Sequence, residues 1–203
     1  MSRELFSLSG GIVLFCCAGL AQASPITYTM QAFGASGSLG GTTFTDADSI
    51  TLTLVGDTAN VTGTVFQSNT VGTFTVSISG IGTATFTDAM ELIVDHIPPP
   101  SLAAAAFGDL TSNGTVLGGF NSDFYSYNLE DASFPITGIG VFDVSANTTA
   151  GVFVLTNLNS PIPGFFMANG PGLVPQSIPE PAINALLSLG LLGIVGYRIL
   201  GRH

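Results

Sequence analysis

A period-two alternation of apolar and polar residues runs through the middle of this 203-residue chain. It is cleanest in Ile50-Thr51-Leu52-Thr53-Leu54-Val55 and in Phe74-Thr75-Val76-Ser77-Ile78. Alternation puts one face of a strand on a core and the other in water, and Thr, Val, Ile and Phe suit such a surface. Further strands are predicted at 26–30, 83–87, 92–94, 124–129 and 152–156, and residues 101–106 are interpreted as a strand of small residues rather than a helical turn.

The spacing of turn residues indicates how these strands are assembled. Gly, Asn, Asp and Pro interrupt the pattern at intervals of roughly eight to twelve residues, as in all-β sandwiches and barrels. The prediction is an all-β fold with a single antiparallel β-sandwich or jelly-roll-like domain over residues 24–168. Thr43-Phe44-Thr45-Asp46-Ala47 recurs as Thr85-Phe86-Thr87-Asp88-Ala89. This echo predicts one strand-to-turn arrangement used twice, with each Phe inward and each Asp opening a turn.

Positive charge is confined to the two ends of the chain. Arg3, Arg198 and Arg202 are its only Lys or Arg residues, whereas eleven acids stand between residues 24 and 178. Binding to nucleic acid or to an anionic membrane surface depends on Lys and Arg, so the composition argues against both. Divalent cations or polyols are better partners for such a surface, although plain solubility explains the charge as well.

The first 23 residues read as a secretory signal peptide. Arg3 makes the N-terminal end weakly basic, residues 5–20 are mostly apolar, and Ala21-Gln22-Ala23 is an A-x-A cleavage site. An uncleaved anchor is the alternative, but the apolar stretch is short for a membrane span. Both cysteines, Cys16 and Cys17, fall in this leader. A mature chain without them has no disulfide, no thiol nucleophile and no Cys-based zinc site.

The C-terminal end combines a rigid triplet, an apolar run and a basic finish. After a Pro- and Gly-rich linker at 169–178 come Pro179-Glu180-Pro181 and an apolar stretch from 182 to 197. Extended to residue 200, with Arg198 reaching the interface, this stretch predicts one transmembrane helix over 182–200. Arg198 and Arg202 form the basic stop-transfer end, which keeps that end in the cytoplasm and the body outside.

This ordered trio resembles the PEP-CTERM sorting signal of Gram-negative bacteria, and the resemblance covers about residues 178–203. It implies handling by exosortase, a membrane protease-transpeptidase, after export by the Sec machinery. It also implies association with extracellular polysaccharide and biofilm. The spaced arginines differ from the arginine cluster common in the family, which leaves a permanent C-terminal anchor as the alternative fate. Pro179, Glu180 and Pro181 are then the sorting motif, and Ala21 and Ala23 mark the signal-peptidase site.

The body offers few residues for chemistry. His96 stands alone without a G-x-S-x-G elbow, so it is interpreted as a strand-end histidine. Asp46-Ala47-Asp48 and residues 56–60 supply oxygen ligands, but turn chemistry explains them better than a weak calcium site. Tyr125 and Tyr127, placed on one face of the strand predicted at 124–129, are the best glycan-stacking candidates. A core or interface pair is the simpler interpretation of these two tyrosines.

Together these features predict an exported, non-enzymatic protein that needs no metal or cofactor. The expected precursor is anchored in the inner membrane, and the expected mature form lies at the cell surface or in an extracellular matrix. One alternative is a polysaccharide-binding module that uses Tyr125 and Tyr127. A second is a secreted hydrolase built on a pair of carboxylates, although no pair among the eleven acids is singled out.

Overall fold

The computed structural model describes residues 23–47, 49–97, 103–141, 145–156, 163–171, 173 and 175–176. These residues form sheets that are antiparallel except for the short β12–β18 pair, together with two short 3-10 helices, so the prediction of an all-β body is confirmed. The strands predicted at 26–30, 50–55, 74–78, 83–87, 92–94 and 152–156 are all present, with shifted ends. The segment of small residues also forms a strand, which begins at Ala104.

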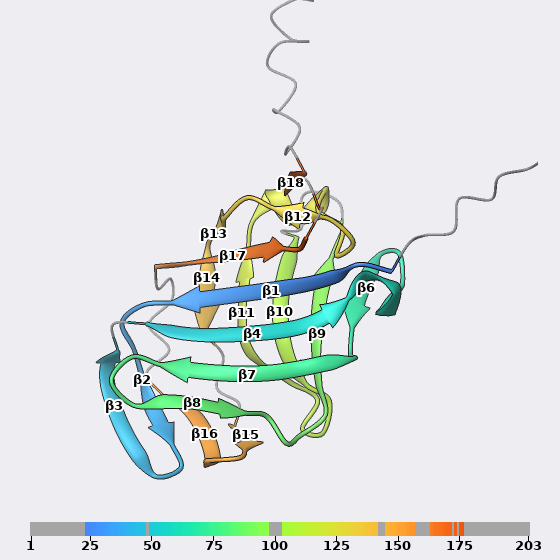
Figure 1. Ribbon diagram of the computed structural model, residues 1–203. Coiled ribbons are helices and arrows are strands. Elements are labelled where there is room, and N and C mark those ends of the chain that lie inside the picture. The colour runs from blue at the N-terminus through green and yellow to red at the C-terminus, as the bar shows by residue number, and fades with distance from the viewer. Residues whose placement is uncertain are drawn as a thin grey trace, which may run out of the picture.

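The elements follow one another in the order shown in Figure 1. They are β1 (Pro25–Ala32), β2 (Ala35–Leu39), β3 (Thr42–Ala47), β4 (Ile50–Asp57), η1 (Thr58–Asn60), β5 (Val61–Thr62), β6 (Phe66–Asn69), β7 (Gly72–Ile78), β8 (Gly82–Thr85), β9 (Met90–Asp95), β10 (Ala104–Asp109), β11 (Gly114–Phe120), η2 (Ser122–Tyr125), β12 (Ala132–Ser133), β13 (Ile136–Thr137), β14 (Ile139–Val141), β15 (Ser145–Thr148), β16 (Gly151–Thr156), β17 (Gly164–Asn169) and β18 (Pro175–Gln176).

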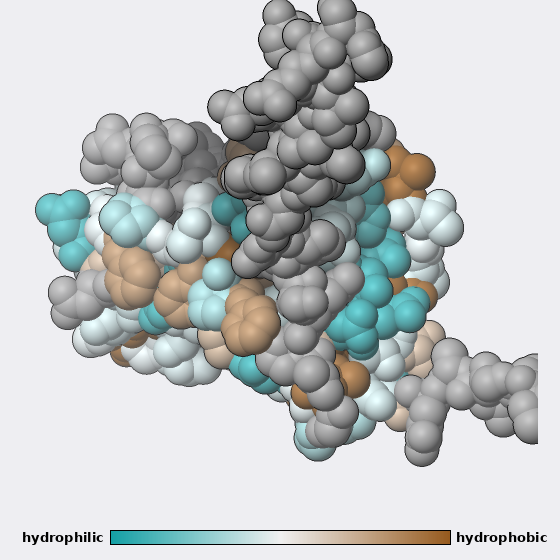
Figure 2. All heavy atoms as spheres, turned by 90° about the horizontal axis from the view of Figure 1, so that it is seen from above, coloured by the Kyte–Doolittle hydropathy of each residue, from teal (hydrophilic) through white to brown (hydrophobic). Residues whose placement is uncertain are grey.

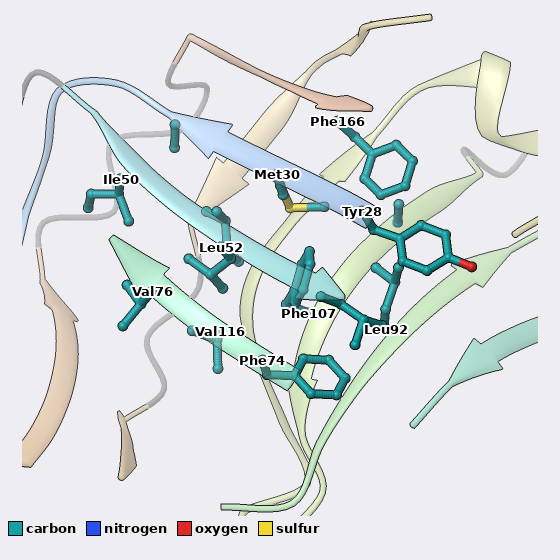
Figure 3. Close-up of a cluster of buried hydrophobic side chains, with 14 of the residues drawn as sticks. Tyr28, Met30, Ile50, Leu52, Phe74, Val76, Leu92, Phe107, Val116 and Phe166 are labelled. Carbon is teal, nitrogen blue, oxygen red and sulfur yellow. The ribbon is translucent and has the colours of Figure 1, made fainter. Parts of the chain in front are cut away.

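Two sheets of six strands pack face to face. The front sheet has the order β13-β17-β1-β4-β7-β8, and the back sheet, whose strands cross behind it in Figure 1, has the order β14-β11-β10-β9-β6-β5. Alternate side chains of each sheet fill the space between them, as the period-two pattern requires. Figure 3 shows the inward set: Tyr28, Met30, Ile50, Leu52, Phe74, Val76 and Phe166 from the front sheet, and Leu92, Phe107 and Val116 from the back sheet.

A third sheet continues the front sheet around a corner. This side sheet has the order β15-β16-β2-β3, and β2 follows β1 after Phe33 and Gly34. Gly34 takes a φ of +74°, a left-handed conformation that few other residues adopt easily, and so it lets the strand turn. The same two stretches of chain pair on both sides of the corner: β17 pairs with β1 in the front sheet, and β16 pairs with β2 in the side sheet. The side sheet buries Phe153 and Leu155 in the common core.

The front and side sheets close on each other along a seam between β8 and β15. Phe86 and Thr148 form an antiparallel bridge, and Thr149 N donates to Thr85 O at 2.8 Å. The Asp88 carboxylate accepts from the Asn147 backbone N–H at 2.6 Å and from its side-chain amide at 3.0 and 3.1 Å. Beneath the seam, the Phe86 and Phe153 rings meet edge to face, 6.1 Å apart. Two short strand edges are thereby covered.

The echoed sequence has its Phe inward at both places, as predicted, but the prediction that each Asp opens a turn is wrong for Asp46, which lies within β3. Phe44 and Phe86 are both buried in the core. Asp46 has a positive φ of 47° at the end of β3, and its N–H donates to Ser36 Oγ. Asp88 instead binds Asn147 across the seam, so the two copies share their inward Phe while their aspartates have different roles.

Two expectations about the chain require correction. The strand predicted at 124–129 is absent, because residues 122–125 form η2, which Asn121 caps by accepting from Asp123 N at 2.9 Å. Part of the segment predicted as linker is also paired: β18 adds to β12 in parallel, with Pro175 opposite Ala132 and Gln176 opposite Ser133.

The predicted transmembrane helix lies outside the described residues. Within them, no helix is long and apolar enough to cross a membrane.

The seam makes a testable prediction about stability. Asn147→Asp places two carboxylates against each other and should lower the free energy of unfolding by about 1–2 kcal/mol. The exchanged pair, Asp88→Asn with Asn147→Asp, restores an amide-carboxylate contact and should recover most of that loss. Denaturant unfolding of the two single variants and the double variant measures the coupling. Strictly additive losses would show that the contact does not hold the seam.

Candidate functional site

Most residues assigned to sorting lie outside the described part of the chain. These are Ala21, the motif Pro179, Glu180 and Pro181, and the basic residues Arg198 and Arg202. Ala23 is the exception, since it is the first described residue and is exposed. Of the predicted signal-peptidase site, the structure therefore describes only Ala23. This residue is followed by Ser24 and then by β1.

The two tyrosines proposed for glycan stacking do not share a surface. Tyr127 is only 3 % exposed and packs edge to face on Phe166, with ring centroids 5.5 Å apart, whereas Tyr125 is 47 % exposed at the end of η2. The prediction that both lie on one face of a strand is wrong, because η2 replaces that strand. The core interpretation is the correct one for Tyr127, and only Tyr125 can present a ring to a ligand.

Tyr127 belongs to a loop that closes one end of the core. This closing loop, residues 121–131, connects β11 to β12 and buries Phe124, Tyr127 and Leu129. Phe124 and Phe166 meet edge to face at 5.6 Å. The loop thus fills the space between the sheets at the end where β1 begins.

Side chains of the body hold the closing loop by its backbone. The Tyr28 hydroxyl donates to Leu129 O, Gln67 Oε1 accepts from Leu129 N at 3.1 Å, and His96 Nε2 lies 2.6 Å from Tyr127 O. The other ring nitrogen of His96 lies 3.0 Å from Thr64 O. His96 follows β9 directly, as expected of a strand-end histidine, and both of its ring nitrogens contact backbone carbonyls.

Burial changes the titration of the two tyrosines that stabilise this end. Desolvation raises the pKa of Tyr28 to about 12, a change that the Asn69 hydrogen bond reduces and that Glu130 and Asp57 increase. Desolvation likewise raises the pKa of Tyr127 well above its ordinary value, with further contributions from Tyr28 and Asp131. Both hydroxyls therefore stay protonated and donate to backbone carbonyls, Tyr127 to Asp131 O at 3.1 Å.

A pocket of about 360 Å³ opens beside the closing loop. We call it the terminal pocket, because both ends of the described chain reach it. It is lined by Ala23, Ser24, Thr58, Ala59, Val61, Glu130, Asp131 and Leu173. The two acids come from the closing loop, Ala23 and Ser24 precede β1, and Leu173 follows β17.

Local hydrogen bonds explain why the two ends meet here. Ser24 N donates to Thr58 Oγ1 at 3.1 Å and Thr58 N donates to Ser24 O at 3.0 Å, so the entry to β1 is fixed against η1. At the other end β18 pairs with β12, which begins directly after Asp131. Seen from above in Figure 2, hydrophilic residues gather on the side where β1 begins. Both ends of the described body therefore lie at the same end of the molecule, where the surface is polar.

The described residues offer little for metal or acid-base chemistry. They contain no group of three or more His, Cys, Asp and Glu side chains that could hold a metal ion. Asp57, one of the oxygen-rich turn residues, caps η1 through a 2.8 Å bond from Ala59 N. Glu130 and Asp131 line the pocket together, but they are neighbours on one loop rather than carboxylates on facing walls. The pocket is better suited to binding a cation than to hydrolysing a glycosidic bond.

In comparisons with protein-family models, with curated proteins and with solved structures, nothing matches this chain. What the terminal pocket does must therefore be inferred from its own residues.

A signal peptide over the first 23 residues makes Ser24 the first residue of the mature chain, but the sequence does not predict that Ser24 lies beside Glu130 and Asp131. Their position beside Ser24 depends on how the closing loop folds, and no local pattern encodes it. The adjacency of two acids in a segment rich in Asn and Tyr was the only signal present.

The burial of Tyr28 and Tyr127 predicts that the folded protein loses stability at high pH. An unfolded chain ionises tyrosine near pH 10, whereas the folded protein keeps Tyr28 protonated to about 12. Their contribution to stability is therefore complete below pH 10 and is lost as the pH rises through the folded value. The denaturant midpoint should fall between pH 10 and 12, with tyrosinate absorbance appearing as the protein unfolds. Tyr28→Phe should be less stable at pH 8 yet show a smaller fall. Early ionisation of both tyrosines in folded protein would contradict this account.

Proposed function

We propose that this chain is an exported β-sandwich protein of the cell surface or extracellular matrix, sorted by exosortase and without enzymatic activity. The observation that carries the proposal is where the folded body begins and ends. Its core extends from Ile26 to Ala168, and its described strands extend from Pro25 to Gln176. The predicted signal-peptidase site precedes the first strand, and the sorting motif follows the last. Both targeting segments can therefore be removed while every core residue in the described part of the chain is kept.

The surface chemistry supports an extracellular role. Between residues 24 and 178 the chain has eleven acids, no Lys, no Arg and no Cys. Such a body repels other copies and anionic polymers, and it has no thiol that an oxidising compartment would modify. Neutral polysaccharide and divalent cations are the matrix components that it tolerates best. The precursor is anchored in the inner membrane through residues 182–200, and its processing partners are the Sec machinery and exosortase.

Several ionisable side chains of the described body are engaged in structural contacts, which is consistent with the proposed structural role. Both ring nitrogens of His96 contact backbone carbonyls, Asp88 is engaged by Asn147, and Asp57 caps η1. Burial raises the pKa of Glu91, but this residue lies on the outer side of β9. None of these groups faces a second acid or base across a cleft.

Sorting can be tested at the motif itself. The two prolines hold an extended segment around Glu180, the shape that protease clefts accept. Alanine at positions 179, 180 and 181 should leave full-length C-terminus in the inner membrane of a host that carries exosortase. Fractionation and intact mass are the measurements, and Pro171→Ala is the control for loss of a nearby proline. Normal release of the triple variant would overturn the proposal.

A polysaccharide-binding role is the second candidate, and the exposure of Tyr125 favours it. Tyr125 is 47 % exposed, and Phe120, at the end of β11 shortly before it, is 52 % exposed. Exposed aromatic rings stack on the apolar faces of sugars. Tyr125→Ala should then weaken retention on purified exopolysaccharide by several-fold, while Tyr125→Phe should keep it. Equal retention of the two variants would remove this candidate.

A further inference from the structure

The backbone nitrogen of Ser24 lies at the terminal pocket and is already fixed there. It donates to Thr58 Oγ1, and Ser24 O accepts from Thr58 N. Neither bond involves Ala23. Cleavage between Ala23 and Ser24 therefore leaves this nitrogen in place while it removes the residue that shares the pocket with it.

That cleavage changes the charge of the nitrogen. A peptide nitrogen is neutral, whereas a free α-amine is mostly protonated below its ordinary pKa of about 7.7–8. No lysine occurs anywhere in the chain, and no arginine occurs between residues 24 and 178. Apart from His96, processing thus creates the one cationic group that the folded body can have. It appears in a pocket lined by Glu130 and Asp131.

The two carboxylates are available for such a partner. Glu130 uses its backbone N–H to bind Asn128 Oδ1, and Asp131 uses its carbonyl to accept from Tyr127. Within the described residues, no hydrogen bond holds either carboxylate. Asp57, the other acid near this end, is already occupied by Ala59 N. Glu130 and Asp131 are therefore the acids that can bind an added ammonium.

We propose that the terminal pocket is the binding site for the chain's own processed N-terminus, whose α-ammonium docks against Glu130 and Asp131. This inference rests on the export processing proposed above. Docking ties the start of β1 to the closing loop, and Tyr127 and Leu129 of that loop fill the end of the core. Removal of the signal peptide would then tighten the end of the fold from which that peptide leaves.

The lack of lysine allows a single-site test. Intact mass of the exported protein first establishes that the chain begins at Ser24. An amine-selective acetylating reagent, followed by hydroxylamine to remove esters, then modifies only the α-amine. The acetyl group replaces the Ala23 carbonyl, which the structure accommodates, and it keeps an N–H for Thr58. It therefore removes charge without adding a clash, and the thermal midpoint should fall by about 1–4 °C in low salt.

Matched variants assign the effect to the pocket. In Glu130→Gln with Asp131→Asn, acetylation should leave the midpoint unchanged, whereas in Glu91→Gln, on the outer side of β9, it should still lower it. Added salt should shrink the difference. An unchanged midpoint in a chain that begins at Ser24 would overturn the docking and leave the sorting proposal intact. A mature chain that begins elsewhere would overturn this inference together with the proposed signal-peptidase site.

Discussion

Closure of the front and side sheets along the β8–β15 seam is the constraint on which the rest of this structure depends. A sheet exposes unpaired N–H and C=O groups at its edges, and proteins commonly protect such edges with lysine. This chain has no lysine. It pairs the two edges with each other instead, through the Phe86–Thr148 bridge and the Asp88–Asn147 contact. Among the other edges of the three large sheets, β5 and β13 have two residues each and β14 has three, whereas β3, at the outer edge of the side sheet, has six.

The same lack of cations shapes the polar interior. Buried groups cannot be matched by Lys or Arg, so hydroxyls, amides and one imidazole bind backbone atoms. Asn69, fully buried, donates to Asp57 O and accepts from Val71 N. Tyr28 and Tyr127 donate to carbonyls of the closing loop. The hydrogen bonds of Tyr28 and Tyr127 join uncharged groups, so they depend little on salt but are lost once these tyrosines ionise.

Clean alternation predicted β4 and β7, and runs rich in β-forming residues predicted β1, β9 and β16; each of these strands places one face on the core. The alternation pattern gave a wrong prediction where local turn geometry determines the structure. The run from Phe124 to Leu129 also alternates, but Asn121 caps a 3-10 turn, and the buried side chains at 124 and 127 are spaced for a turn rather than a strand. The strands β2 and β11 are rich in Gly and Ser, and so they give no periodic signal. The terminal pocket could not be predicted from local sequence patterns, because it joins residues from the start, middle and end of the body.

The proposed processing would remove positive charge and negative charge from the chain in unequal amounts. Removal of both targeting segments takes away all three arginines but only two of the thirteen acids. The net negative charge therefore belongs to the body, and the three arginines belong to the two terminal segments that are proposed to direct export and sorting. β1 begins at the terminal pocket and carries the chain to the side sheet at its far end, about 25 Å away for eight extended residues. If both ends of the precursor are held at the membrane as proposed, the terminal pocket faces the membrane and the side sheet faces away from it. Under the same proposal the α-ammonium forms at that end of the molecule, so the acids nearest the membrane are the ones that would gain a positive partner on removal of the signal peptide.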